Sequence, residues 1–326
     1  MPNSAEDMNP ARRANLDIRP FQRPLGAEVR CGDVRRLGKD ARAAIRDAWL
    51  DHLVILIRGQ SLAPDDLVEF IRTFGEVELA TPVSELPPGI RERPNPYLSM
   101  VSNIREGGMP IGTLGDGEVV WHSDMSYHEE PISASMLYAV EVPSGGGQTG
   151  FVNMYQAYES LPSHLAAGIE SMRIKNDATY NSAGQIRRGM SAVTDVRASP
   201  GVVHPAVRTH PETHHNALYL GRRPNAYVQG LRVAESESLL DALWQHATSL
   251  PAWFHDWKVG DIVIWDNRCV MHRRQPFDPG ARRLLQRAQC KGTRPVISAD
   301  AVPAPHPRSR LPGLAGRDAG KETLRA

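Results

Sequence analysis

His122 and Asp124 are separated by one residue in Val-Val-Trp-His-Ser-Asp, residues 119–124. The apolar β-formers before His122 predict a strand, in which alternate side chains point to one face. The imidazole and the carboxylate would then lie side by side, with Ser123 facing the other way. Such a pair supplies two of the three ligands of a facial iron(II) site, which keeps coordination positions open. The simpler alternative is a histidine at a strand end paired with a surface aspartate.

A third metal ligand would have to come from elsewhere in the chain. His272 ends the apolar stretch DIVIWDNRCVMH and is one candidate. Other histidines are also available: His128, His204, His210, His214, His215 and His255. His214 and His215 lie in a polar turn, where a solvated role is expected, and the aromatic surroundings of His255 favour a packed core histidine.

Two arginines follow His272 in the stretch ARRLLQRAQ. If this stretch is a strand, Arg283, Leu285 and Arg287 share one face. Arg283 and Arg287 would lie about 13 Å apart, at ~3.3 Å per residue, which suits two different anionic groups better than one. Arginine binds carboxylates in a planar, bidentate manner. The alternative is a solvated edge strand that carries three arginines.

Many short strands and a few helices would position these residues. The predicted strands are Ile18–Gly32 (two strands around a turn), Leu53–Ile57, Tyr97–Ile104, Ala134–Val140, Gln148–Asn153, Val203–Thr209, Ala217–Gly221, Trp253–Trp257, Asp261–Trp265, Cys269–His272 and Arg282–Lys291. The predicted helices are Leu37–His52, Ala63–Phe74, Met154–Leu161, Pro162–Ser171 and Ala234–Ser249. This pattern predicts an α+β, mainly β, chain with a double-stranded β-helix (jelly-roll) core and helical cover.

The remaining segments indicate how the chain is organised. Residues 1–17 are expected to be a mobile N-terminal arm, residues 18–296 one domain, and residues 297–326 a disordered tail. Glu76–Pro96 is rich in proline and would be either a lid or a plain surface excursion. Asn176–Val202 is polar, carries Arg187 and Arg188, and is expected to be a loop or mobile cover.

Composition excludes several classes of protein. The formal charge is +1, from 38 basic and 37 acidic side chains, so no nucleic-acid-binding surface is expected. No apolar run approaches the ~20 residues that span a bilayer, and the polar N-terminus has no signal region. The three cysteines are sparse and lack Cys-x-x-Cys spacing, which favours free thiols in a reduced compartment. We expect a cytoplasmic protein.

The ordered motifs resemble those of the iron(II)/2-oxoglutarate-dependent dioxygenases of the TauD/TfdA (taurine and 2,4-dichlorophenoxyacetate dioxygenase) family. The matching pieces span residues 18–296 and are LGAEV, VILIRGQ, FGEVE, WHSDMSY, VPSGGGQTGFVNMYQAYESLP, GDIVIWDNRCVMHR and RRLLQRAQCKGTRP. The resemblance implies that His122, Asp124 and His272 bind Fe(II). It also implies that Thr149 and Arg283 hold 2-oxoglutarate, with Arg283 on the distal carboxylate. Without the resemblance, Thr149 would be taken for a turn-capping hydroxyl.

The resemblance further implies a reaction that consumes O2 and 2-oxoglutarate and releases succinate and CO2. Taurine-type members carry a His/Tyr pair after FGE, which VELATPVSELPPG lacks, so the chain looks closer to the aryloxyalkanoate branch. We expect hydroxylation of a small anionic organic acid, with or without C–O cleavage, and Arg287 and Asn103 as substrate-binding residues.

Other readings of the family stay open at this point. The alternatives are a sulfonate or alkyl-sulfate dioxygenase, a biosynthetic hydroxylase of an amino-acid-like substrate, and a non-catalytic metal-binding relative. The chain is also expected to form a homo-oligomer, a dimer or a tetramer, as family members commonly do.

Overall fold

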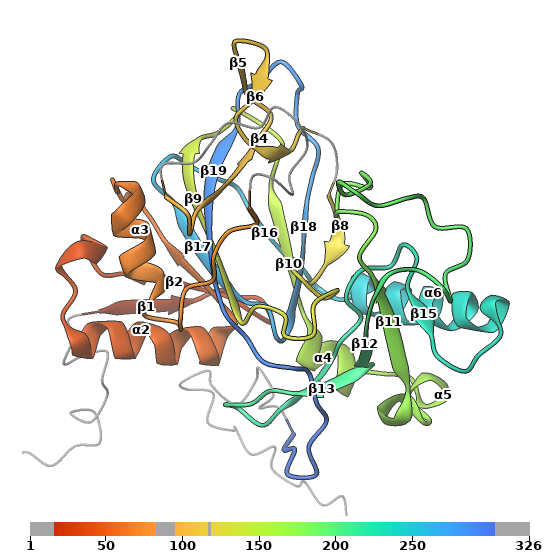
Figure 1. The fold of residues 1–326 in the computed structure, drawn as a ribbon. Helices are drawn as coiled ribbons and strands as arrows, with labels where there is room; N and C mark the ends of the chain where they lie inside the picture. Colours follow the sequence, from red (N-terminus) through yellow and green to blue (C-terminus); the bar gives the residue numbers. More distant parts are fainter. Residues whose placement is uncertain (1–15, 83–94, 117–118, 304–326) are drawn as a thin grey trace, which may run out of the picture.

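The computed structural model describes residues 16–82, 95–116 and 119–303 (Figure 1). Most of the expected N-terminal arm, residues 83–94 of the proline-rich segment and residues 304–326 of the expected tail lie outside these ranges. Within them the chain forms a mixed, sheet-rich fold with a small number of helices.

Two sheets face one another and carry the residues of interest. The larger has eight strands in the order β1-β2-β3-β17-β9-β19-β4-β7, and the smaller has the order β16-β10-β18-β8. The larger sheet consists of β1 (Asp17–Pro20), β2 (Ala27–Arg30), β3 (Val54–Ile57), β17 (Ile262–Asp266), β9 (Ala134–Glu141), β19 (Leu284–Cys290), β4 (Ser99–Ser102) and β7 (Thr113–Leu114). The smaller consists of β16 (Trp253–His255), β10 (Thr149–Asn153), β18 (Val270–Arg274) and β8 (Val119–His122).

The described helices and remaining strands flank the two facing sheets (Figure 1). On one side lie η2 (Val34–Arg36), α2 (Lys39–His52) and α3 (Pro64–Ile71). On the other lie α4 (Met154–Glu159), α5 (Ser163–Ala166), η4 (Ile169–Ser171), β11 (Arg173–Asp177), β12 (Gly201–Pro205), β13 (Val207–Thr209), β14 (Asn216–Leu218), β15 (Tyr227–Val228) and α6 (Val233–Ser249). A short hairpin joins β5 (Arg105–Glu106) to β6 (Met109–Pro110).

The strand β3 is apolar on both of its faces. Its central residue Leu56 belongs to the core between the two sheets, together with Phe151 and Leu285. Its neighbours Ile55 and Ile57 belong to a second core under α2 and α3. Because both faces are covered, the strand is apolar throughout instead of alternating. The predicted central strand at Leu53–Ile57 is therefore confirmed.

The helix α2 ends where the sequence predicts it to end. Leu53 adopts a left-handed conformation (φ 66°), and its N–H donates to the Trp49 carbonyl at 2.7 Å. This cap closes the last turn and directs the chain into β3. The buried face of α2 repeats at helical spacing and consists of Ala41, Ala44, Ile45, Ala48 and Trp49.

The structure changes the bounds of two expectations for residues 176–209. Residues 178–200 contain no helix or strand, as expected for a loop, but the ends of the expected segment lie inside β11 and β12, which pair in antiparallel fashion. The single strand expected at Val203–Thr209 is two strands, β12 and β13, which belong to different sheets. Pro205 lies at the break, and because proline has no N–H donor it ends the β12 ladder.

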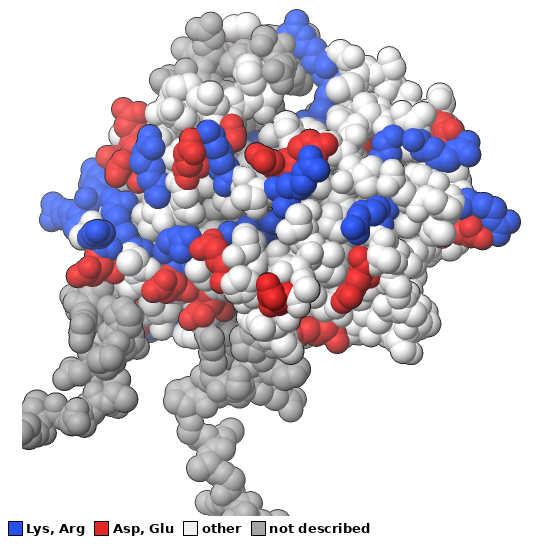
Figure 2. Space-filling view, turned by 60° about the horizontal axis from the view of Figure 1, so that its bottom comes forward, with Lys and Arg blue, Asp and Glu red and all other residues white. Residues whose placement is uncertain are grey.

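Several expectations from composition agree with the structure. Cys31, Cys269 and Cys290 are all free thiols. In the described part of the chain, no helix is long and apolar enough to cross a membrane. Lysine and arginine side chains are interspersed with aspartate and glutamate on the face shown in Figure 2. On this face the two kinds of charge are mixed.

Candidate metal centre and active site

His122 and His272 are direct cross-strand neighbours in the smaller sheet, β8 against β18. Their ring centroids lie 4.2 Å apart and both side chains are buried. Asp124 completes the group, with its Oδ1 atom 3.3 Å from Nε2 of His122 and 3.8 Å from Nε2 of His272. One ligand atom from each residue lies within 4.8 Å of the others. The structure therefore brings the three predicted ligands to one point.

Hydrogen bonds determine which atom of His122 and which atom of Asp124 is free. Nδ1 of His122 lies 2.8 Å from the Val120 carbonyl, so this nitrogen carries the proton and Nε2 presents its lone pair. Oδ2 of Asp124 accepts from Ser135 Oγ at 2.8 Å and from Gln289 Nε2 at 3.1 Å, which leaves Oδ1 for the cluster. The hydroxyl and the amide therefore orient the carboxylate.

The ionisation of the cluster suits a divalent metal. Burial, together with the neighbouring His122, lowers the pKa of His272 to about 3, so its imidazole is neutral at neutral pH. Burial alone would raise the pKa of Asp124, but the nearby imidazoles and Arg287 outweigh it and lower the pKa below its usual range. Two imidazoles and one carboxylate on one side of a site form the donor set of facial iron(II) centres. The residues present thus fit the metal.

Asp124 reaches the cluster from a turn, and the strand expected to extend through it is wrong. β8 ends at His122, and Met125 adopts a left-handed φ of 57°. Asn267 holds this turn: its Oδ1 accepts from the Asp124 N–H at 2.7 Å, and its Nδ2 donates to the carbonyls of Asp124 and Ile132 at 2.9 and 3.0 Å. A buried amide from a distant strand end therefore sets the position of the carboxylate.

A second buried group, His210, Asp266 and Cys269, also clusters tightly. Both nitrogens of His210 are already used, however. Nδ1 accepts from the N–H groups of Glu212 and Thr213, and Nε2 donates to Oδ2 of Asp266 at 3.0 Å. Arg268 also donates to both carboxylate oxygens of Asp266, so this group is a hydrogen-bonded structural network.

Arg283 is a buried cation that lacks an anion. Its side chain is only 2% exposed, Nη2 donates to the Gly147 carbonyl at 3.3 Å, and Nε and Nη1 have no partner. Among the described residues, no carboxylate lies within salt-bridge distance of it. Burial, and secondarily Arg274, lowers the pKa of Arg283 to about 9. A buried, unpaired guanidinium of this kind fits a carboxylate ligand.

Thr149 lies between the metal ligands and Arg283. Along β10 it shares a face with Phe151, which pairs with His272 in register and stacks near its ring. In the other direction it lies two residues from Gly147, which contacts Arg283. Its hydroxyl accepts from Nε1 of Trp257 at 2.9 Å, a partner that sequence reasoning missed.

The two expected substrate residues differ in their surroundings. Arg287 lies beside the cluster: Nη1 is 3.8 Å from Oδ1 of Asp124, and Nε donates to Ser99 at 3.1 Å. Asn103 instead holds the backbone before β19, donating to the Ala281 carbonyl at 2.8 Å and accepting from the Arg283 N–H at 3.0 Å. Its amide therefore supports the position of Arg283.

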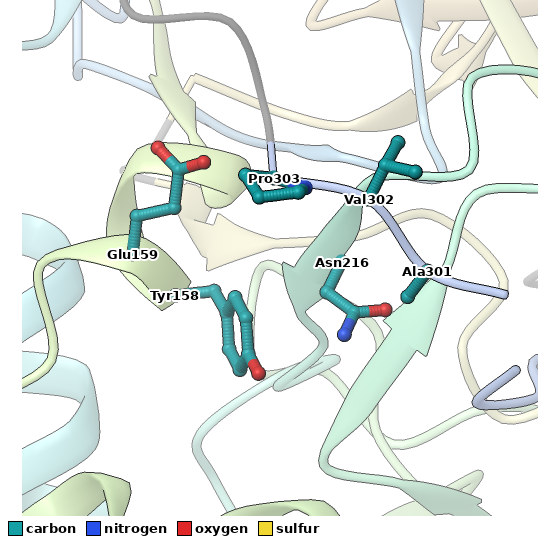
Figure 3. Close-up of a pocket in the computed structure, with 6 residues that line it drawn as sticks. All are labelled: Tyr158, Glu159, Asn216, Ala301, Val302 and Pro303. Carbon is teal, nitrogen blue, oxygen red and sulfur yellow. The ribbon is translucent and has the colours of Figure 1, made fainter. Parts of the chain in front are cut away.

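Two hollows on the described surface lie away from this cluster. One, of about 250 Å³, is shown in Figure 3 and is lined by Tyr158, Glu159, Asn216, Ala301, Val302 and Pro303. Another, of about 360 Å³, lies along the ends of β2 and β3. Neither includes a residue of the cluster, so neither competes with it as the reaction site.

A comparison with known protein families identifies the chain. A family model described as "Taurine catabolism dioxygenase TauD, TfdA family" matches residues 17–289. The chain belongs to this family. As a TauD/TfdA family member it is a 2-oxoglutarate-dependent dioxygenase, and Fe(II), 2-oxoglutarate and O2 are the cofactor and co-substrates of this reaction.

Relatives within the TauD/TfdA family cover most of the chain. It is 36% identical over 282 residues to the alpha-ketoglutarate-dependent 2,4-dichlorophenoxyacetate dioxygenase of Cupriavidus pinatubonensis, covering 82% of this chain and 95% of the relative. It is 29% identical over 299 residues to the (S)-phenoxypropionate/alpha-ketoglutarate-dioxygenase of Sphingobium herbicidovorans, covering 87% and 96%. The crystal structure of AAD-2 in complex with Mn(II) and N-oxalylglycine matches with 29% identity and a TM-score of 0.69, covering 86% and 99%.

Several residues of this TauD/TfdA member were missed by sequence reasoning. Ser135 and Gln289 orient the carboxylate of Asp124, and Asn267 holds its backbone. Gln289 could have been found, because it lies at even spacing from Arg287 on the inward face of β19. Asn267 carried only the signal of a polar residue directly after an apolar strand.

Proposed function

We propose that the enzyme hydroxylates a small organic acid of the aryloxyalkanoate class and releases succinate and CO2. The observation that carries this proposal is the position of Arg287, whose guanidinium borders the metal cluster, with Nη1 3.8 Å from Oδ1 of the predicted ligand Asp124. A substrate anion bound there would lie next to the metal. The names of two relatives, which refer to 2,4-dichlorophenoxyacetate and phenoxypropionate, support the same class.

The site residues have separate roles in this proposal. His122, Asp124 and His272 hold Fe(II), and Arg283 holds the distal carboxylate of 2-oxoglutarate with help from the hydroxyl of Thr149. Arg287 binds the anionic end of the substrate. Asn103 acts indirectly, because its amide bonds to the backbone at Ala281 and Arg283, and we assign it to positioning Arg283.

The chemistry that ferrous iron supplies when bound is the activation of dioxygen, coupled to oxidative decarboxylation of 2-oxoglutarate. The chain supplies orientation and exclusion of water. Trp265 and Phe151 pack against the ring of His272, with centroids 4.5 and 6.3 Å away, and keep that side of the centre apolar. In this proposal Arg283 and Arg287 bind different anions, 2-oxoglutarate and the substrate, so that each of the two has its own position.

The facing sheets support a jelly-roll (double-stranded β-helix) fold, and the family match over residues 17–289 supports one domain at 18–296. We also propose that the chain forms a homo-oligomer, whose size the family resemblance does not fix. Location in the cytoplasm stays a prediction from the sequence.

An anaerobic titration tests the proposed function. The enzyme with Fe(II) and 2-oxoglutarate should develop a weak visible charge-transfer band, and 2,4-dichlorophenoxyacetate should shift it. Arg287→Ala should lose apparent affinity for this acid and keep 2-oxoglutarate binding. An unchanged affinity would contradict the anion role.

Product analysis separates the proposed function from its alternatives. A phenol with glyoxylate or pyruvate indicates hydroxylation followed by C–O cleavage. A sulfonate or sulfate would suit the same cation, and release of sulfite or sulfate from such substrates would favour a sulfonate or alkyl-sulfate dioxygenase instead.

A further inference from the structure

The segment between β11 and β12 crosses the strand that carries His122. The N–H of Val120 donates to the Ser182 carbonyl at 3.2 Å, and Arg222, which forms a backbone bridge with His122, donates to the Asn181 carbonyl. Arg222 also pairs with Asp177 at 3.1 Å. These contacts hold the segment against β8, so the side chains of the segment can take part in the site.

Arg187 is the residue of this segment that reaches toward the turn of Asp124. Its guanidinium carbon lies 4.0 Å from the ring centroid of Tyr127, three residues after Asp124. The backbone N–H of Arg187 donates to the Thr179 carbonyl at 2.7 Å, which fixes the start of the side chain. The aromatic ring supports the cation from one face and leaves its edge available for hydrogen bonds.

The charge of Arg187 is not balanced by the described part of the protein. Its Nε atom is buried without a hydrogen-bond partner, and no described carboxylate lies within salt-bridge distance of its guanidinium. The carboxylates of Asp177 and Asp124 are committed elsewhere, Asp177 to Arg222 and Asp124 to the ligand cluster. The Tyr127 phenol lies within electrostatic range of both Arg187 and Arg287.

We infer that Arg187 is a second anion anchor of the substrate site, which binds the acidic group of the substrate together with Arg287. This inference rests on the proposed function, because it concerns the same substrate. Arg287 comes from the rigid sheet and lies beside Asp124, whereas Arg187 comes from the segment over β8. A substrate carboxylate between them would meet guanidinium groups on two sides, with the Tyr127 ring next to its organic part.

The test compares Arg187→Met with Arg188→Met, which removes the same charge one residue away on an exposed side chain. Anaerobic enzyme with Fe(II) and 2-oxoglutarate is titrated with 2,4-dichlorophenoxyacetate, with benzoate as a generic carboxylate, and with uncharged 2,4-dichloroanisole. Arg187→Met should weaken the binding of both acids about tenfold and leave the binding of dichloroanisole unchanged. The charge-transfer band with 2-oxoglutarate should stay intact. Arg187→Lys should restore part of the loss, and Arg188→Met should match the native enzyme.

The inference is overturned if Arg187→Met behaves like Arg188→Met, if it weakens dichloroanisole as much as the acids, or if the native enzyme binds neither acid. Failure of the proposed function gives a different result. In that case the native enzyme binds benzoate but hydroxylates no aryloxyalkanoate, and the benzoate titration of the variants still decides the role of Arg187.

Discussion

Asn267 and Asp124 form a reciprocal pair in which the side chain of one satisfies both backbone groups of the other. The Asp124 N–H donates to Asn267 Oδ1 at 2.7 Å, and Asn267 Nδ2 donates to the Asp124 carbonyl at 2.9 Å. The pair is buried and joins the end of β17 to the turn after β8. The carboxylate therefore reaches the two histidines from a turn whose geometry a distant residue imposes.

Replacing Asn267 should weaken metal binding although none of the three metal ligands is changed. Asn267→Leu leaves the Asp124 N–H and carbonyl without partners, at about 1–3 kcal/mol of unfolding free energy for each buried group. We expect a 10–100-fold loss in Fe(II) or Mn(II) affinity, the range seen when groups that orient metal ligands are removed. Chelator competition and urea unfolding measure the two effects. Asn267→Asp, which keeps the acceptor and loses the donor, should be intermediate in metal affinity, and native affinity in both variants would contradict the role.

Removing the buried cation at position 283 should have opposite effects on binding and stability. Arg283→Met should reduce 2-oxoglutarate affinity by about a hundredfold or more, because a desolvated charge pair loses one partner. The same variant should be at least as stable as the native protein without co-substrate, since a buried unpaired charge is replaced by an apolar side chain. Anaerobic calorimetric titration and thermal unfolding check these outcomes. Retained affinity, or a large loss of stability, would contradict this account.

The affinity for 2-oxoglutarate should fall at alkaline pH. Burial is the main cause that lowers the pKa of Arg283 to about 9, so above that pH the ligand-free site loses its positive charge and affinity should fall. The free energy of unfolding should change with pH in the opposite direction. The unfolded chain, with the ordinary pKa of 12.5, binds more protons between pH 9 and 12.5, so Arg283 makes the free energy of unfolding rise with pH in that window. Arg283→Met should remove both dependences, which titrations at several pH values would reveal.

Gly147 should tolerate no side chain. It has a φ of +69°, and an added Cβ would lie 3.2 Å from Nε of Arg283. Gly147→Ala should therefore displace the guanidinium and raise the KM for 2-oxoglutarate about tenfold, if the loss is near 1.4 kcal/mol. Gly145→Ala is the matched control, because nothing lies within 4 Å of its added Cβ. Equal KM values for the two variants would show that the position of the Arg283 guanidinium does not depend on the absence of a side chain at Gly147.

Hydrophobic pattern was enough to find most elements that carry the site. The fully apolar run at β3 and the helical spacing of α2 are local signals, and both predictions are confirmed. The break at Pro205 was missed because the apolar pattern continues across it. Proline has no N–H donor, so the β12 ladder ends there, and β13 belongs to another sheet.

The site was predictable to the extent that its residues follow local rules. The strand that carries His122 follows from its local apolar pattern, whereas His272 was one of several candidate histidines until the family motifs selected it together with Arg283. The turn at Asp124 was not predictable, since Met125 is a non-glycine residue in a left-handed conformation and the amide that holds it is far away in sequence. Arg187 was noticed only as part of a polar segment, because nothing local indicates that this segment returns to β8.

The hydrogen bonds that hold the cluster make it a rigid chelator, and a rigid chelator can bind the wrong metal ion. Two imidazoles and a carboxylate bind Ni²⁺, Cu²⁺ and Zn²⁺ more tightly than ferrous iron by the Irving–Williams order. The Val120 carbonyl, Ser135 and Gln289 orient the donors for any of these ions, so the fold cannot reject the wrong ion by misalignment. Correct loading must then depend on which metals the host cell keeps available, and nickel-affinity purification would tend to poison the enzyme.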